Sequence, residues 1–167
     1  MDEFLPILND NGEVIGKATR KECHSGLMLL HPVVHLHIIK PGGYIFLQKR
    51  SFNKDIQPGK WDTAVGGHVD NGESIDDALL REAHEELGLI DIKPHKLTSY
   101  IFCSEIEREL INVYYIVVDD DFYAEFDSNE IEEVRFWHSS EIDSSIGKNI
   151  LTPNFEQEFL HIKHLIK

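Results

Sequence analysis

The stretch GGHVDNGESIDDALLREAHEELGL, residues 66–89, decides the fold of this chain. Seven of its 24 residues are aspartate or glutamate, and Arg81 is its only arginine or lysine. Glu82, Glu85 and Glu86 follow one another at i, i+3 and i+4. On a helix, like charges at that spacing cost about 0.2–0.5 kcal/mol per pair. The stretch therefore carries a cluster of negative charge that needs a counter-charge.

The local signals predict a helix over residues 75–87. Ser74 followed by Asp77 is an N-terminal capping pattern, and Gly88 is a natural residue just beyond the last turn. At about 100° per residue, the three glutamates lie on an arc beside the apolar face, not opposite it. That apolar face is formed by Leu79, Leu80, Ala83 and Leu87.

The position of the glutamates favours a metal site over a solvated face. A face that only meets solvent would lie opposite the leucines and would include lysines. Divalent cations such as Mg²⁺ bind carboxylates together with substrate phosphates. We therefore expect Mg²⁺ or Mn²⁺ here. Because Gly66 and Gly67 let the backbone approach closely, the Gly66 carbonyl is a further expected ligand.

Composition limits the partners. The net charge of -14 disfavours nucleic acid polymers and anionic membranes, since binding to polyanions depends on Lys/Arg–phosphate contacts. A small diphosphate substrate remains compatible if a cation bridges it to the protein. The 167 residues suit a single domain, and either a monomer or a homodimer is compatible with them. Two cysteines without a CxxC motif, and a start without a signal peptide, predict a cytoplasmic protein.

The remaining pattern predicts an α/β protein. A helical stripe of apolar residues runs through 154–167, and the strands do not alternate regularly with helices. This favours a mixed sheet covered by helices over a doubly wound parallel sheet. The runs that predict strands are 4–8, 13–15, 32–40, 44–49, 93–104, 109–118 and 131–137.

The stretch resembles the Nudix box, which here spans residues 67–89. The resemblance depends on Gly67, on Glu73 and on the run REAHEELGL, which begins at Arg81. It implies the α/β/α sandwich of the Nudix hydrolases, with a mixed sheet, and hydrolysis of a nucleoside diphosphate linked to another group. It also implies a Glu73–Arg81 ion pair that holds the loop on the helix, with metal-binding and catalytic glutamates at Glu82, Glu85 and Glu86.

Outside the box, the sequence resembles the branch of this superfamily that includes isopentenyl-diphosphate isomerase. In that enzyme three histidines and two glutamates bind a divalent metal, and basic side chains contact the diphosphate. The resemblance implies diphosphate contacts at Arg20, Arg50 and Lys54. The matching metal ligands are His24, His31, His68, Glu107 and Glu109.

One departure separates this chain from the isomerase. The isomerase needs a cysteine just before the box, where this chain has Gly66. Isomerisation needs a paired acid and base, and Glu109 supplies only one of them. We also expect the glycine to widen the pocket and admit water. Hydrolysis is therefore the leading interpretation, and a residual isomerase-like enzyme or a non-catalytic nucleotide or diphosphate sensor are the alternatives.

Two questions stay open at the level of sequence. The general base of a hydrolase could be Glu107, Glu109, Glu130 or Glu133. His35 and His37 alternate with His31 on one face of a predicted strand. For these two we expect half-buried side chains satisfied by hydrogen bonds, not metal ligands.

Overall fold

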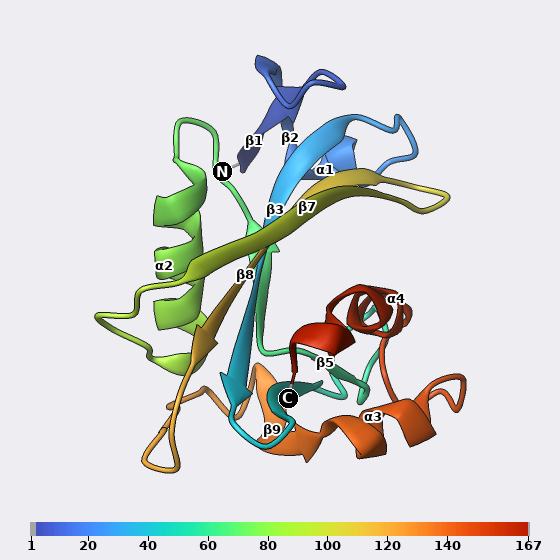
Figure 1. The fold of residues 1–167 in the computed structure, drawn as a ribbon. Helices are drawn as coiled ribbons and strands as arrows, with labels where there is room; N and C mark the ends of the chain where they lie inside the picture. Colours follow the sequence, from blue (N-terminus) through green and yellow to red (C-terminus); the bar gives the residue numbers. More distant parts are fainter. Residues whose placement is uncertain (1–2, 167) are drawn as a thin grey trace.

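A seven-stranded mixed sheet forms the centre of the molecule in a computed structural model that describes residues 3–166 (Figure 1). Strand β3 (Leu30–Lys40) runs parallel to β8 (Arg108–Val117), and every other strand pair is antiparallel. The predicted mixed sheet is therefore confirmed. The strand order is β5-β4-β3-β8-β7, while β6 pairs with β3 and β9 pairs with β4. The other strands are β4 (Tyr44–Arg50), β5 (Trp61–Thr63), β6 (Val65–His68), β7 (His95–Cys103) and β9 (Ile131–His138).

Helices cover both faces of this sheet, because side chains alternate along β3. Leu36 and its even-numbered neighbours join the core under helix α2 (Ile75–Leu87). Ile39 faces the other way and joins the core under α3 (Ser139–Ser145) and α4 (Pro153–Ile162). Figure 1 shows α2 on one side of the sheet and α4 on the other. The predicted α/β/α sandwich is confirmed.

The N-terminal segment forms a separate two-stranded hairpin, β1 (Phe4–Leu8) and β2 (Val14–Thr19). Its turn contains Gly12 at φ 83°, a conformation that favours glycine. The short helix α1 (Arg20–Cys23) follows at once, and the Thr19 hydroxyl caps it by accepting from the Glu22 N–H. This helix places His24 close to the start of β3.

The two predicted helices form with one change each. Helix α2 has the predicted bounds, the Ser74 hydroxyl accepts from the Asp77 N–H, and Gly88 is left-handed. Leu80, however, is 43% exposed, so its assignment to the buried face was wrong. The predicted C-terminal helix 154–167 is shorter, because α4 ends at Ile162 and a 3₁₀ turn, η1 (Lys163–Leu165), follows. Its last predicted residue lies outside the described part of the chain.

Candidate active site

A pocket of about 650 Å³ opens at the end of the sheet where β6 meets the connection between β7 and β8. Its walls come from segments that are far apart in the sequence: the start of β3, the loop after β4, and the start of α4. Among its charged lining residues are Arg20, Arg50, Glu86, Glu107 and Glu109.

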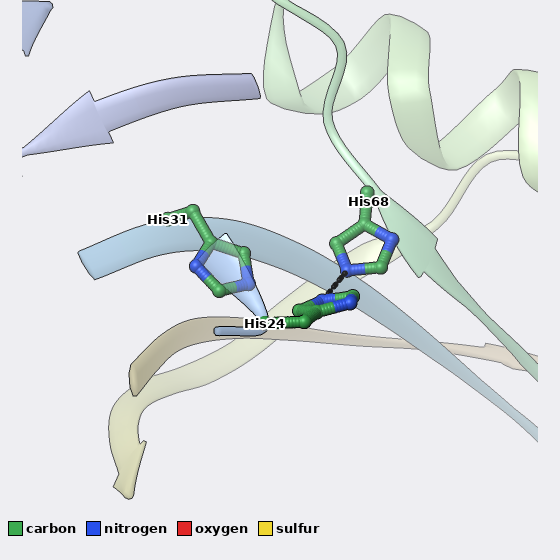
Figure 2. Close-up of side chains that lie close together, drawn as sticks. All are labelled: His24, His31 and His68. Carbon is green, nitrogen blue, oxygen red and sulfur yellow. Dashed lines mark hydrogen bonds between the residues drawn. The ribbon is translucent and has the colours of Figure 1, made fainter. Parts of the chain in front are cut away.

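Three histidines, His24, His31 and His68, lie close together (Figure 2), and two of them, His24 and His68, line this pocket. The ring centroids of His24, His31 and His68 lie 5.1–5.6 Å apart, and Nε2 of His24 is 3.2 Å from Nε2 of His68. Glu107 approaches His24 Nε2 to 3.0 Å, and Glu109 approaches His31 Nε2 to 3.9 Å. The structure therefore brings together all five residues that the resemblance implied.

His31 has the hydrogen bonding of a metal ligand. It is fully buried, and its Nδ1 lies 2.9 Å from the Leu29 carbonyl, so Nδ1 carries the proton. Its Nε2 therefore presents a lone pair toward Glu107 and Glu109. Within residues 3–166 this buried nitrogen has no hydrogen-bond partner. A histidine whose other nitrogen donates to a backbone carbonyl is the usual arrangement at metal sites.

The protonation states also fit a cation. Burial, helped by Arg20 and the neighbouring histidines, lowers the pKa of His68 to about 3, so this imidazole is neutral. Burial and the nearby Glu107 raise the pKa of Glu109 to about 7. Neutral imidazoles beside crowded carboxylates are a donor set that suits a divalent metal ion.

Arg81 organises the box. Its Nε donates to one carboxylate oxygen of Glu73 at 2.8 Å and its Nη2 to the other at 3.0 Å. Nη2 also donates to the His68 carbonyl, which links α2 to the end of β6. The side-chain hydrogen bonds to Arg81 lower the pKa of the Glu73 carboxyl. The predicted Glu73–Arg81 ion pair is present.

The three box glutamates have different surroundings. Nη1 of Arg81 donates to Glu82 at 2.9 Å and to Glu85 at 3.3 Å. Glu85 is 57% exposed at its side chain, whereas Glu86 lies against the pocket wall. The described chain contains two groups of at least three possible metal-ligand atoms in which all atoms of a group lie within 4.8 Å of one another. Neither group includes a box glutamate. In this structure Glu82 and Glu85 instead share the Nη1 group of Arg81 as a hydrogen-bond donor.

Two glycines let the helix approach the sheet at this point. A Cβ on Gly67 would lie 2.2 Å from Cδ of Glu82, so no other residue fits there without a shift. The N–H of Gly66 donates to Glu86 at 3.1 Å, and Gln48 donates to its other oxygen at 3.1 Å. Burial raises the pKa of Glu86 to about 8.

Some of the expected phosphate-binding residues and candidate general bases line the pocket, and the others lie outside its lining. Arg20 and Arg50 line the pocket, whereas Lys54 lies outside its lining and bonds to Glu130 at 3.0 Å. Of the four candidate bases, the two that line the pocket are Glu107 and Glu109. The other two, Glu130 and Glu133, are exposed.

A buried polar network on the α4 side was not found from the sequence. Glu158, 1% exposed, accepts from His35 Nδ1 at 2.9 Å, from His37 Nε2 and from the Tyr100 hydroxyl at 2.6 Å. The expectation that both histidines are hydrogen-bonded is confirmed, although His37 is fully buried and not half-buried. A signal was available, because Glu158 falls on the apolar stripe of its helix beside Phe155.

His35 is the direct neighbour of Gly66. A Cβ on Gly66 would lie 3.2 Å from Cδ2 of His35, so the histidine ring lies beside the glycine. The register of the sheet explains this, since His35 and Gly66 are direct partners on β3 and β6. The expectation that the glycine widens the pocket stays a prediction.

Comparison with known proteins defines the class. The NUDIX domain family matches residues 29–153, so this chain belongs to the Nudix family. It is a hydrolase of the class that acts on pyrophosphate-containing compounds. No helix among the described residues combines the length and apolar character needed to cross a membrane.

The relatives of this chain include both a Nudix hydrolase and an isopentenyl-diphosphate isomerase. The chain is 33% identical over 158 residues to the uncharacterized Nudix hydrolase SCO1686 of Streptomyces coelicolor, covering 92% of this chain and 84% of that protein. It is 36% identical over 96 residues to the isopentenyl-diphosphate Delta-isomerase of Cutibacterium acnes, covering 58% of this chain and 48% of the isomerase. The crystal structure of DR0079 from Deinococcus radiodurans has the same fold, with a TM-score of 0.77 and 22% identity over 95% of this chain and 98% of that one.

Proposed function

We propose that this protein is a Mg²⁺- or Mn²⁺-dependent pyrophosphohydrolase that cleaves a diphosphate linkage in a nucleoside diphosphate-type small molecule. The observation that carries the proposal is the position of Glu86. Its half-buried carboxylate lies on the pocket wall and accepts hydrogen bonds from Gly66 and Gln48, on a box helix that Arg81 ties to the sheet. A box with every expected residue in place, whose Gly67 and Glu86 line the pocket, fits turnover better than simple binding.

The chain's own residues have separate roles in this proposal. Glu82, Glu85, Glu86 and the Gly66 carbonyl would hold the catalytic cations. A bound divalent cation neutralises phosphate charge and lowers the pKa of the attacking water. For Glu82 and Glu85 to serve as ligands, Arg81 has to share or release its contacts with them.

Substrate binding and proton transfer would come from the other walls of the pocket. Arg20 and Arg50 are placed to bind phosphate oxygens, since guanidinium groups suit that geometry. Glu109, which lines the pocket together with Glu107, is the proposed acceptor of the proton from water. Lys54 would have to leave Glu130 to take part.

We also propose a second metal site at His24, His31, His68, Glu107 and Glu109, separate from the box. The buried, unpartnered Nε2 of His31 supports it. The same residues favour one other candidate function, an isopentenyl-diphosphate isomerase-like activity. That activity is disfavoured because Gly66 has no side chain that could transfer a proton.

One set of assays tests the proposal. The protein is incubated with Mg²⁺ or Mn²⁺ and a panel of nucleoside diphosphate compounds, and separately with isopentenyl diphosphate. Release of phosphate-containing products from the panel is the expected result. Migration of the double bond would favour the isomerase-like activity, and binding without turnover would favour a sensor.

A further inference from the structure

The ring of His35 lies between a buried carboxylate and the pocket. On one edge, Nδ1 donates to Glu158, which is 1% exposed. The other edge faces Gly66, because a Cβ on that glycine would lie 3.2 Å from Cδ2 of His35 and 3.5 Å from its Nε2. Both His35 and Gly66 line the pocket, and the side chain of His35 is 13% exposed. The edge of the ring that carries Nε2 is therefore the one near the pocket.

We propose that His35 is a substrate-binding residue that donates a hydrogen bond from Nε2 to a phosphate oxygen of the diphosphate, with Glu158 holding its ring in place. This inference rests on the proposed function and names a contact that neither the box nor the three-histidine cluster supplies.

Satisfying Glu158 does not require His35. The carboxylate already accepts from His37 and from the Tyr100 hydroxyl at 2.6 Å. His37 is fully buried and is not part of the lining of the main pocket. Of these three donors, His35 is the one that lines the main pocket. A role confined to the core would not need that exposure.

The charge around the ring supports an anion contact. Nδ1 of His35 lies 2.9 Å from the Glu158 carboxylate, which is 1% exposed, and this direct pairing in the core favours the positively charged imidazole. A protonated imidazole carries an N–H on both nitrogens, so Nε2 is free to donate. A fixed charged donor suits phosphate recognition, because charge-assisted hydrogen bonds are the stronger ones and the ring is already oriented.

Gly66 is part of the same arrangement. His35 and Gly66 face each other across β3 and β6, and the lack of a side chain at Gly66 leaves room for the imidazole. A side chain at this position would press on the ring from the pocket side. The absence of a side chain at Gly66 therefore has a structural role, in addition to the proposed role of the Gly66 carbonyl as a metal ligand.

The test is a binding titration that needs no turnover. Methylenediphosphonate, which cannot be hydrolysed at its P–C–P bridge, is titrated by calorimetry in the presence of Mg²⁺ into wild type, His35→Asn and His37→Gln. Asparagine places an amide N–H near the position of Nδ1 and so keeps a donor to Glu158, while Nε2 is lost. Glutamine at 37 likewise keeps a donor near the position of Nε2 for Glu158.

We expect His35→Asn to bind the probe about 10- to 100-fold more weakly, as for loss of one charged hydrogen bond. His37→Gln should bind within about twofold of wild type. Unchanged affinity in His35→Asn, or an equal loss in both variants, would overturn the proposal. If His35→Asn does not fold, the imidazole ¹⁵N signals of wild type replace it. The Nε2 signal of His35, assigned by its loss in His35→Gln, should shift with the probe, and a fixed signal would overturn the proposal.

The two proposals fail in different ways. Binding of the probe through His35 without turnover of any panel compound would reject the hydrolase and keep the contact. Turnover with normal probe affinity in His35→Asn would reject the contact and keep the hydrolase. A wild-type protein that does neither would reject both.

Discussion

Arg81 meets Glu73 through two parallel hydrogen bonds, from Nε at 2.8 Å and from Nη2 at 3.0 Å. The same guanidinium reaches the His68 carbonyl at 3.1 Å. One side chain thus joins the loop before α2, the helix itself and the end of β6. Because this set of hydrogen bonds needs a planar group with several donors, lysine cannot replace arginine at position 81.

Arg81→Lys should therefore lower the free energy of unfolding by about 1–3 kcal/mol, as expected for losing charge-assisted hydrogen bonds in a partly buried site. Urea denaturation measures this. Arg108→Lys is the matched control, because Arg108 pairs with Asp10, whose side chain is 87% exposed, and such pairs contribute about 0–1 kcal/mol. Equal losses of unfolding free energy in the two variants would show that the Arg81 network stabilises the protein no more than an exposed ion pair does.

Glu86→Gln should keep the fold and reduce kcat by a factor on the order of 10²–10⁴. Glutamine keeps the shape of the half-buried side chain but removes the negative charge that a cation needs. Steady-state kinetics at saturating Mg²⁺ and far-UV circular dichroism give the two readouts. The exposed Glu132→Gln serves as the control. Near wild-type turnover in Glu86→Gln would refute the assignment of this residue as a metal ligand.

The double variant His24→Ala, His31→Ala should lower the number of bound metal ions by one and leave the box site occupied. The reason is that these two residues supply two of the three imidazoles in the cluster. Elemental analysis after loading with Mn²⁺ or Zn²⁺ and removal of excess metal counts the ions. His164→Ala, on an exposed residue, is the control. An unchanged count in the double variant contradicts the second site.

The His35–Glu158 pair predicts a pH-dependent stability. The pKa of His35 is raised from 6.5 to about 9, so its contribution is complete below pH 6.5 and is lost as the pH rises through 9. Burial opposes the charge on Glu158, yet the two histidines hold its pKa well below 4.5, so its contribution is present above pH 4.5. The pair therefore stabilises most between pH 4.5 and 6.5.

Glu158→Gln should accordingly lose up to about 3 kcal/mol of unfolding free energy at pH 6, since one pKa unit corresponds to about 1.4 kcal/mol. The loss should be smaller at pH 10. Urea denaturation of wild type and variant at the two pH values measures the difference. A loss that is the same at both values would mean that the network acts through packing and not through charge.

Isopentenyl diphosphate should not incorporate deuterium from D₂O with this protein and Mg²⁺, because no cysteine stands at Gly66. Mass spectrometry of the recovered diphosphate checks this against an enzyme-free control. Gly66→Cys would place its Cβ 3.2 Å from the His35 ring, so the ring must move by a few tenths of an ångström to admit it. Incorporation by wild type would contradict the prediction and identify another proton-transfer group.

The sequence alone determined the features that depend on neighbours a few residues apart. Helix α2 has its predicted bounds because its cap, its apolar period and Gly88 act within a few turns. The resemblance of the same stretch to the Nudix box implied the Glu73–Arg81 pair. The short elements α1, β5 and β6 were not found, because they have too few residues to show a period.

Only the tertiary structure decided which side chains meet in the pocket. Nothing local in the sequence places His35 against Glu158, 123 residues away, or the ring of His35 beside Gly66. Both contacts follow from the register of β3 with β6 and from the docking of α4 on the opposite face from α2. Strand register and helix docking are set by long-range burial of apolar surface, which the periodicity of one segment does not encode.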